Sequence, residues 1–178
     1  MDKQTRERVK RILKKDAKLL RLKQTFQDLP QYNLDFDELK QEMKHLHSSR
    51  KLHSLEVNSP NFVRNLSKAA ILDHSFRTRL TEIQVMGLEA TTLLSKTLNS
   101  MVDYLVNEYA NDLAKLRTKE ERKQFVVGIM EPYYEYLIDA EQLLQICKSY
   151  IDNIDKGGFM ITQLVNAHQV IRKFEGNT

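Results

Sequence analysis

The fold class is decided by residues 59–116, SPNFVRNLSKAAILDHSFRTRLTEIQVMGLEATTLLSKTLNSMVDYLVNEYANDLAKL. Apolar side chains recur at every third or fourth position, which is the spacing of one helix face. Ser59 and Pro60 form a start signal, a capping hydroxyl followed by proline at the first helical position. Gly87 need not interrupt the helix, although it costs about 1 kcal/mol relative to alanine. The pattern predicts helix as far as about Leu116, which indicates a bundle of long helices, a coiled-coil-like element, or a break that periodicity does not locate.

Helical spacing continues on both sides of this stretch. One predicted helix spans about residues 3–27 and ends before Pro30, because the residue before a proline avoids the helical region. Downstream, Thr118 and Glu121 have the spacing of a capping box. Further breaks are predicted at Gly128 with Pro132, and at Gly157–Gly158, after which a last helix runs from about Met160 to Phe174.

Composition supports the same class. The 178 residues are 41% hydrophobic and 29% charged, and they include only 5 Gly and 3 Pro, too few for the many turns of an all-β protein. The predicted fold is all-α, a bundle of long helices with a basic N-terminal helical arm. The predicted division is an arm at 1–29, a short helix and linker at 30–58, and a helical oligomerisation core at 59–178. No apolar run reaches the roughly 18 residues of a membrane span.

Positive charge is concentrated at the N-terminus. Residues 1–23, MDKQTRERVKRILKKDAKLLRLK, contain ten Lys or Arg against three acidic residues, a net charge of +7. The rest of the chain contains 18 basic and 21 acidic residues, so the first segment accounts for the whole excess of +4. Such a face fits nucleic acid, an anionic membrane or acidic protein, or plain solvent. We favour nucleic acid, bound through phosphates without sequence preference.

Candidate nucleic-acid-binding residues are the basic side chains of this segment and a few on the long helix. They are Arg6, Arg8, Lys10, Arg11, Lys14, Lys15, Lys18, Arg21, Lys23, Arg64, Lys68, Arg77, Arg79 and Lys96.

Catalytic and metal chemistry find little support. The histidines lack the companion ligands of a metal site, and His74 and His168 lie on apolar stripes, which favours hydrogen-bonded core histidines. Cys147 lies among aliphatic residues and is predicted to be a small buried hydrophobe. Tyr133, Tyr134 and Tyr136 suit either base stacking or packing, and packing is favoured. We expect no enzyme, no metal and no cofactor.

The C-terminal third carries a family resemblance. The stretch YEYLIDAEQLLQICKSYIDNIDKGGFMITQLVNAHQVIRKFEGNT resembles the end of UvsY, the recombination mediator of T-even-type phages. The shared features are a Leu-Leu-x-x-Cys run, a helix stop followed by Phe159 and Ile161, and a final helix closing in RKFEG. The resemblance extends upstream through AAILDHSFRTRLTEIQVMGLEATTLL and TKEERKQFV, so it covers about residues 59–178.

The resemblance implies a function and a set of partners. UvsY-like proteins are non-enzymatic helical proteins that form rings and bind single-stranded DNA. They help a RecA-like recombinase to replace the single-strand-binding protein. By this resemblance the chain is a homo-oligomer in the cytoplasm of an infected bacterial host. It departs from the family where the early long helix should carry a basic patch, because TTLLSKTLNSMVDYL offers only Lys96, and at Gly158, where the family has a basic residue.

A rival hypothesis needs no nucleic acid. The chain would then be a helical assembly or adaptor protein, such as a virion or scaffold component, and the apolar side of its basic segment would dock on a helical bundle.

Overall fold

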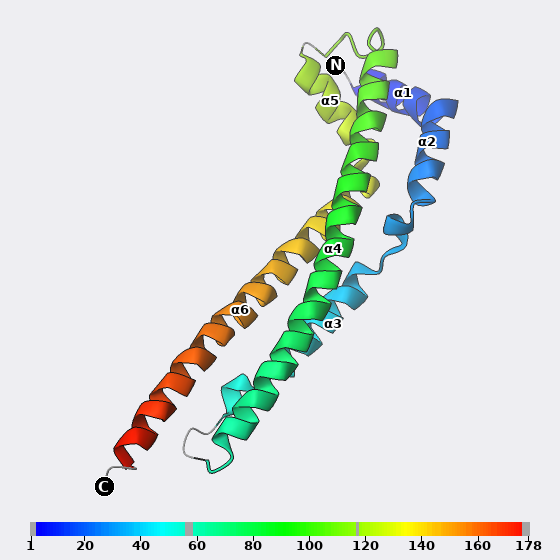
Figure 1. The fold of residues 1–178 in the computed structure, drawn as a ribbon. Coiled ribbons are helices and arrows are strands. Elements are labelled where there is room, and N and C mark those ends of the chain that lie inside the picture. The colour runs from blue at the N-terminus through cyan, green and yellow to red at the C-terminus, as the bar shows by residue number, and fades with distance from the viewer. Residues whose placement is uncertain (1–2, 56–58, 117, 176–178) are drawn as a thin grey trace. The chain divides into compact units, whose positions relative to one another are not determined.

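The structure, a computed structural model, describes residues 3–55, 59–116 and 118–175. Every regular element in these ranges is helical, which confirms the all-α prediction (Figure 1). The elements are α1 (Lys3–Lys14), α2 (Ala17–Gln27), η1 (Pro30–Asn33), α3 (Phe36–Ser48), η2 (Leu52–Ser54), α4 (Phe62–Glu108), α5 (Lys119–Val127) and α6 (Glu131–Glu175).

The predicted long helix is present as α4, which has 47 residues. It begins at Phe62, two residues after the predicted first helical position Pro60. Pro60 and Asn61 form a turn before it, in which the Ser59 hydroxyl accepts a hydrogen bond from the Asn61 amide at 3.3 Å. The predicted end at Leu116 is wrong, because α4 ends at Glu108. Residues 109–116 form successive turns instead, with the Leu116 amide donating to the Leu113 carbonyl at 2.9 Å.

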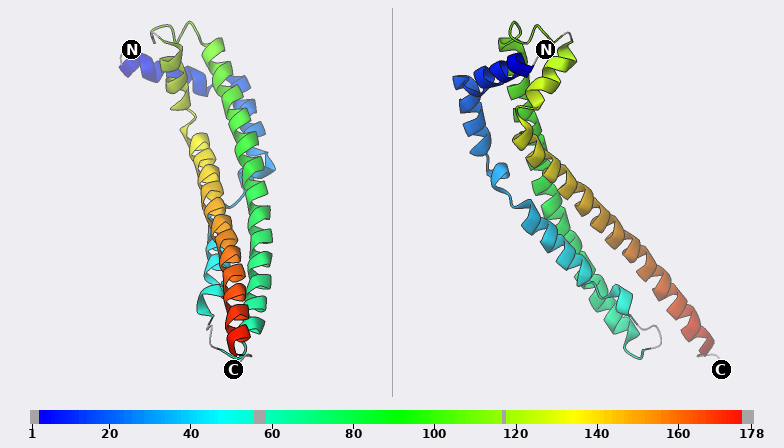
Figure 2. Two further views of the ribbon diagram at one scale, coloured as in Figure 1. Left: turned by 60° about the vertical axis from the view of Figure 1, so that its left-hand side comes forward. Right: turned by 180° about the vertical axis from the view of Figure 1, so that it is seen from behind.

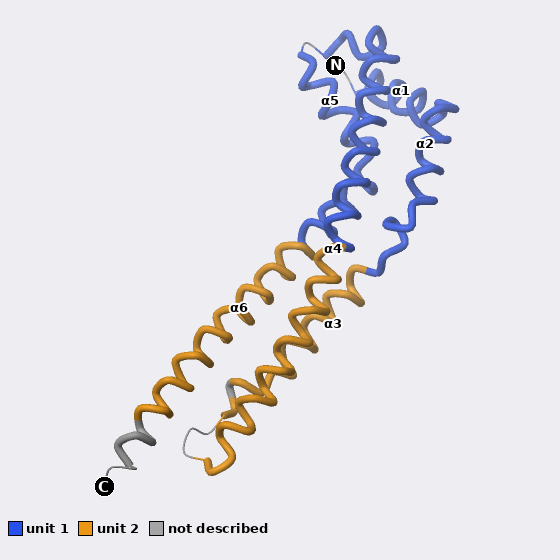
Figure 3. The backbone as a smooth tube through the Cα atoms, viewed as in Figure 1, with its two compact units in different colours: residues 1–35, 86–142 blue, residues 36–85, 143–178 orange. Residues whose placement is uncertain are grey.

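The chain divides into two compact units (Figure 3). Unit 1 contains residues 1–35 and 86–142, and unit 2 contains residues 36–85 and 143–178. These units do not follow the predicted linear segments 1–29, 30–58 and 59–178, because α4 and α6 each contribute to both.

In unit 1 the basic segment forms two helices rather than the predicted single one. The break is at Asp16, whose backbone is extended and whose carboxylate accepts the Leu19 amide at 2.6 Å as the N-cap of α2. An aspartate oxygen competes well for free backbone donors, so it starts a new helix more readily than it continues an old one. Val9 and Leu13 of α1 are buried, as are Leu19 and Phe26 of α2.

The predicted boundaries around α5 are confirmed. Thr118 accepts the Glu121 amide at 3.0 Å and Glu121 accepts the Thr118 amide at 3.4 Å, which completes the capping box. Gly128 caps the end of α5, and α6 begins at Glu131.

Several aromatic residues of unit 1 pack against one another, as predicted for Tyr133 and Tyr136. Phe26 contacts Tyr133 edge to face at a centroid distance of 5.0 Å, and Tyr32 at 5.2 Å. The Tyr136 hydroxyl donates to the Leu34 carbonyl at 2.7 Å. Desolvation, opposed by the weaker effect of this hydrogen bond, raises the pKa of Tyr136 to about 12. The ring cluster therefore joins α2, η1 and the start of α6.

In unit 2 the first half of α4 and the second half of α6 run antiparallel. Leu80 meets Cys147, Arg77 meets Asp155, and Phe62 meets His168, so residue numbers rise along one helix as they fall along the other. Figure 2 shows α3 running alongside the first half of α4. One hydrophobic cluster of unit 2 contains the buried residues Leu52, Phe62 and Leu66. Partly buried Leu55, Ile161 and Leu164 pack against this cluster.

The predicted helix stop at Gly157–Gly158 is wrong. α6 continues through both residues, and no described glycine has a positive φ. Gly157 is buried because η2 approaches it closely: a Cβ placed there would lie 2.6 Å from Nη2 of Arg50 and 3.1 Å from Cδ2 of Leu52. The glycine is needed for this close approach, and the predicted final helix is the last part of α6.

Three predictions of core residues in unit 2 have different outcomes. His74 is exposed, so its prediction as a core histidine is wrong, whereas His168 is half-buried with its ring 5.6 Å from that of Phe62. Cys147 is confirmed as a buried residue, and its thiol donates to the Leu80 carbonyl at 3.0 Å. Burial raises the pKa of this thiol to about 11, which suits packing rather than reactivity.

Candidate nucleic-acid interface

The outer face of α1 is a dense array of cations. Val9 and Leu13 occupy the buried side. The exposed basic side chains of the helix and the residue after it are Lys3, Arg6, Arg8, Arg11, Lys14 and Lys15. Lys10 is partly covered and lies 3.6 Å from the Glu7 carboxylate. An amphipathic helix orients its polar side outward when its apolar side packs, so the fold itself turns these charges toward solvent.

A shallow hollow follows one side of α1 from Lys3 to Lys15. Its lining includes Arg8 and Arg11, with Glu7 as the one carboxylate among the described lining residues and Ile12 as the apolar one. Guanidinium groups bind phosphate oxygens in a planar fork, so the lining chemistry suits a polyanion with some apolar surface.

The cations of α2 are arranged differently, since two of them lie on aromatic rings. The ammonium of Lys18 lies 4.2 Å from the centre of the Tyr104 ring, and that of Lys23 lies 5.6 Å from the centre of the Tyr133 ring. Arg21 is exposed. Burial, with repulsion from Lys14 as a second cause, lowers the pKa of Lys23, so cations of α1 and α2 act on one another.

Asp16 anchors the junction of α1 and α2. Its carboxylate accepts the hydroxyl of Tyr109 at 2.6 Å and that of Tyr104 at 3.2 Å, besides the Leu19 amide. Desolvation opposes ionisation of Asp16, but these hydrogen bonds outweigh it and hold its pKa below the ordinary value. The single acidic residue within this part of the basic segment is thus occupied by three donors.

The candidates on α4 separate into two groups. Arg64, Lys68 and Lys96 are exposed. Arg77 and Arg79 instead pair with carboxylates of unit 2, the first with Asp155 at 2.7 and 3.2 Å and the second with Glu42 at 2.6 and 3.0 Å. Arg79 also reaches Glu82 at 2.9 Å. These hydrogen bonds raise the pKa of both arginines, lower those of Asp155 and Glu42, and leave fewer donors for a ligand.

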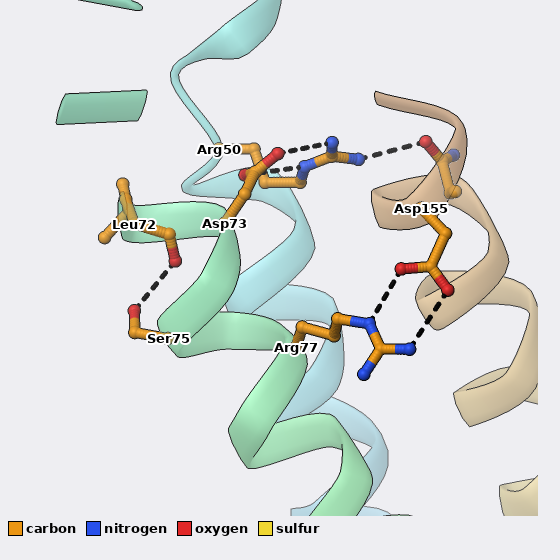
Figure 4. A network of polar contacts seen from close by, with 7 residues as sticks. Arg50, Leu72, Asp73, Ser75, Arg77 and Asp155 are labelled. Atoms are coloured by element: carbon orange, nitrogen blue, oxygen red, sulfur yellow. Dashed lines mark hydrogen bonds and ion pairs between the residues drawn. The ribbon is translucent and has the colours of Figure 1, made fainter. Parts of the chain in front are cut away.

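Sequence reasoning missed the buried polar centre of unit 2 (Figure 4). Arg50 donates to both oxygens of Asp73 at 3.0 and 2.7 Å and to the Asn153 side chain at 3.0 Å. The side chains of Arg50 and Asp73 are only 1% and 6% exposed. The sequence contains one sign of this centre, since Asp73 lies among the apolar residues of the long helix. No residue near Asp73 in the sequence indicates that Arg50, which follows α3, is its partner.

Other kinds of site find no support in the described part of the chain. No group of three or more His, Cys, Asp or Glu side chains there is placed to hold a metal ion. None of the helices in those ranges is long and apolar enough to cross a membrane.

Fold and surface together define an all-helical protein with a cationic surface on α1 and α2. No family model, no curated protein and no solved structure matches the chain.

Proposed function

We propose that this protein is a non-enzymatic recombination mediator that binds single-stranded DNA without sequence preference. It acts as a homo-oligomer and helps a RecA-like recombinase to replace the single-strand-binding protein. The observation that supports DNA binding is the array of exposed cations on α1 and α2. The resemblance of residues 59–178 to UvsY supplies the mediator role, although α6 lacks the helix stop expected from that resemblance.

The distribution of charge explains why we assign the DNA contacts to α1 and α2. The part of α4 where UvsY-like proteins carry a basic patch offers Lys96 alone in this chain. Arg77 and Arg79, also on α4, form ion pairs with carboxylates. Phosphate contacts by lysine and arginine release counterions from the nucleic acid, which gives affinity for any sequence. A mediator that must act on any exposed single strand needs this kind of binding.

The test is a fluorescence-anisotropy titration of the full-length protein with a labelled single-stranded oligonucleotide. For about seven phosphate contacts, log K should fall with log salt with a slope of roughly −5, since each contact on a single strand contributes about −0.7. Between 50 and 200 mM salt this corresponds to about a thousandfold loss of affinity. Binding that is absent at low salt, or that ignores salt, would overturn the proposal.

Matched variants locate the surface. Neutralising Arg8, Arg11 and Lys15 to Gln should make the slope less steep by about 2, since three contacts are lost. Neutralising Lys44, Lys119 and Lys123, which are exposed elsewhere, changes the total charge equally and should leave the slope near that of the wild type. Equal effects of the two triple variants would remove α1 from the mechanism.

The same preparation distinguishes the rival functions. An oligomer in solution that ignores DNA would favour an assembly or adaptor protein. Binding to vesicles of anionic lipid, with no binding to DNA, would favour a membrane-surface role.

A further inference from the structure

Lys18 and Tyr104 form a solvent-accessible cation–π pair near the junction of α1 and α2. The ammonium of Lys18 lies 4.2 Å from the centre of the Tyr104 ring, and Tyr104 is half-buried while Lys18 is exposed. The side chain over this face of the Tyr104 ring is thus a solvent-exposed lysine. If the lysine moves away, this face of the ring is uncovered. The cations Lys14, Lys15 and Arg21, three or four residues from Lys18 in the sequence, are also exposed.

The ring is held in place through its hydroxyl, whereas the lysine over it is exposed. The Tyr104 hydroxyl donates to Asp16 at 3.2 Å, and Asp16 also accepts Tyr109 at 2.6 Å. The same carboxylate caps α2 through the Leu19 amide. The hydroxyl end of the ring is therefore tied to the N-terminus of the helix that carries Lys18. A stacking surface needs this kind of orientation, because a ring that turns freely loses entropy when a base packs on it.

We propose that the Tyr104 ring is a base-stacking site, on which a nucleobase of a bound single strand replaces the ammonium of Lys18. Lys18 then moves to a neighbouring phosphate. The inference rests on the proposed function, since it concerns the same single-stranded ligand. Proteins that hold single strands without sequence preference combine cations along the backbone with aromatic rings under the bases.

Tyr133 is a poorer stacking surface than Tyr104, although Lys23 lies over its ring. Phe26 packs edge to face on it at 5.0 Å and Tyr32 lies 6.4 Å away, so its environment is that of the core. The distance from Lys23 to the ring is also longer, at 5.6 Å. The ring cluster around Phe26 therefore serves packing, whereas the Lys18–Tyr104 pair is the one that a base can enter.

Asp16 does not prevent an approaching phosphate. Its carboxylate is occupied by two tyrosine hydroxyls and a backbone amide. Lys15 directly precedes it and Lys18 follows two residues later, so cations outnumber it locally.

The experiment compares two oligonucleotides of equal length, one of thymidines and one of abasic sugar phosphates. With Tyr104→Leu, affinity for the thymidine strand should fall about fivefold or more, whereas affinity for the abasic strand and the salt slope should not change. Tyr104→Phe keeps the ring but loses its hydrogen bond to Asp16, so its affinity for the thymidine strand should lie between those of the wild type and Tyr104→Leu. Equal losses on both strands, or no loss, would overturn stacking.

A second variant covers the case in which Tyr104→Leu does not fold. The chain contains no tryptophan, so Tyr104→Trp introduces a single indole reporter. Its fluorescence should be quenched by the thymidine strand and not by the abasic strand, and equal quenching by both would overturn the inference. Failure of the wild type to bind either strand would refute the proposed function itself, whereas salt-dependent binding without base dependence would refute only stacking.

Discussion

The two neighbouring glycines of α6 allow a sharp test of the structure. Gly157 is buried against η2, whereas a Cβ added at Gly158 would meet nothing within 4 Å. Replacing a glycine by alanine in an open helix position stabilises it by about 1 kcal/mol. We therefore expect Gly158→Ala to raise the free energy of unfolding by about that amount.

Gly157→Ala should have the opposite effect. The new methyl group would lie 2.6 Å from Nη2 of Arg50 and 3.1 Å from Cδ2 of Leu52. The guanidinium cannot retreat cheaply, because it is buried and donates to Asp73 and Asn153. Overpacking costs about 1–3 kcal/mol, which exceeds or cancels the gain of about 1 kcal/mol in helix propensity. If Arg50 is expelled, the broken buried pair costs about 3–5 kcal/mol instead.

Urea denaturation of the full-length variants, followed by circular dichroism at 222 nm, measures this difference. The midpoint should rise for Gly158→Ala and fall or stay level for Gly157→Ala. Equal stabilisation by both substitutions would show that Arg50 does not approach Gly157. Strong destabilisation by both would show that the glycines adopt a left-handed conformation that ends the helix, because alanine is strained there.

Three further predictions concern the anchoring interactions of each unit. Arg50→Met should lower the free energy of unfolding by about 3–5 kcal/mol, because it leaves Asp73 buried and unpaired, and Asp73→Leu in the same chain should restore much of the loss in urea denaturation. Thr118→Ala should cost about 1 kcal/mol through loss of the α5 cap, measured in the same way against Thr118→Ser, which keeps the hydroxyl. The hydrogen bond to Asp16 is the largest cause that raises the pKa of Tyr109 to about 12. This hydrogen bond contributes fully to stability below the ordinary tyrosine pKa of about 10, and its contribution is lost as the pH rises toward the pKa of folded Tyr109. The melting temperature of the wild type should therefore exceed that of Tyr109→Phe by less and less over this pH interval. A difference that stays constant with pH would contradict the hydrogen bond between Tyr109 and Asp16.

Much of the architecture follows from local patterns. The capping box of Thr118 and Glu121 and the break before Pro132 involve residues within one helical turn of each other, so their geometry is visible in the sequence. The period of the apolar residues likewise predicts α4, because a helix face repeats every three or four residues.

The errors have identifiable physical causes. Asp16 interrupts the apolar stripe of the basic segment in the sequence. Only the structure shows that it begins a new helix, because its carboxylate accepts a hydrogen bond from the Leu19 amide. His74 is exposed because the buried face of α4 passes through Leu66, Ala69 and Asp73 instead. Helix ends and the width of a buried face depend on which elements pack nearby, which a single periodic pattern does not specify.

The sequence alone determined the helical class, the long α4, the α5 cap and the one-sided concentration of positive charge, because these depend on side chains a few positions apart. Only the tertiary structure decided that α6 passes through Gly157 and Gly158, that Arg50 pairs with Asp73, and that Lys18 covers Tyr104. Those features join residues far apart in the chain. A glycine, an arginine or a tyrosine takes such a role from the atoms that approach it in space, not from its neighbours in sequence.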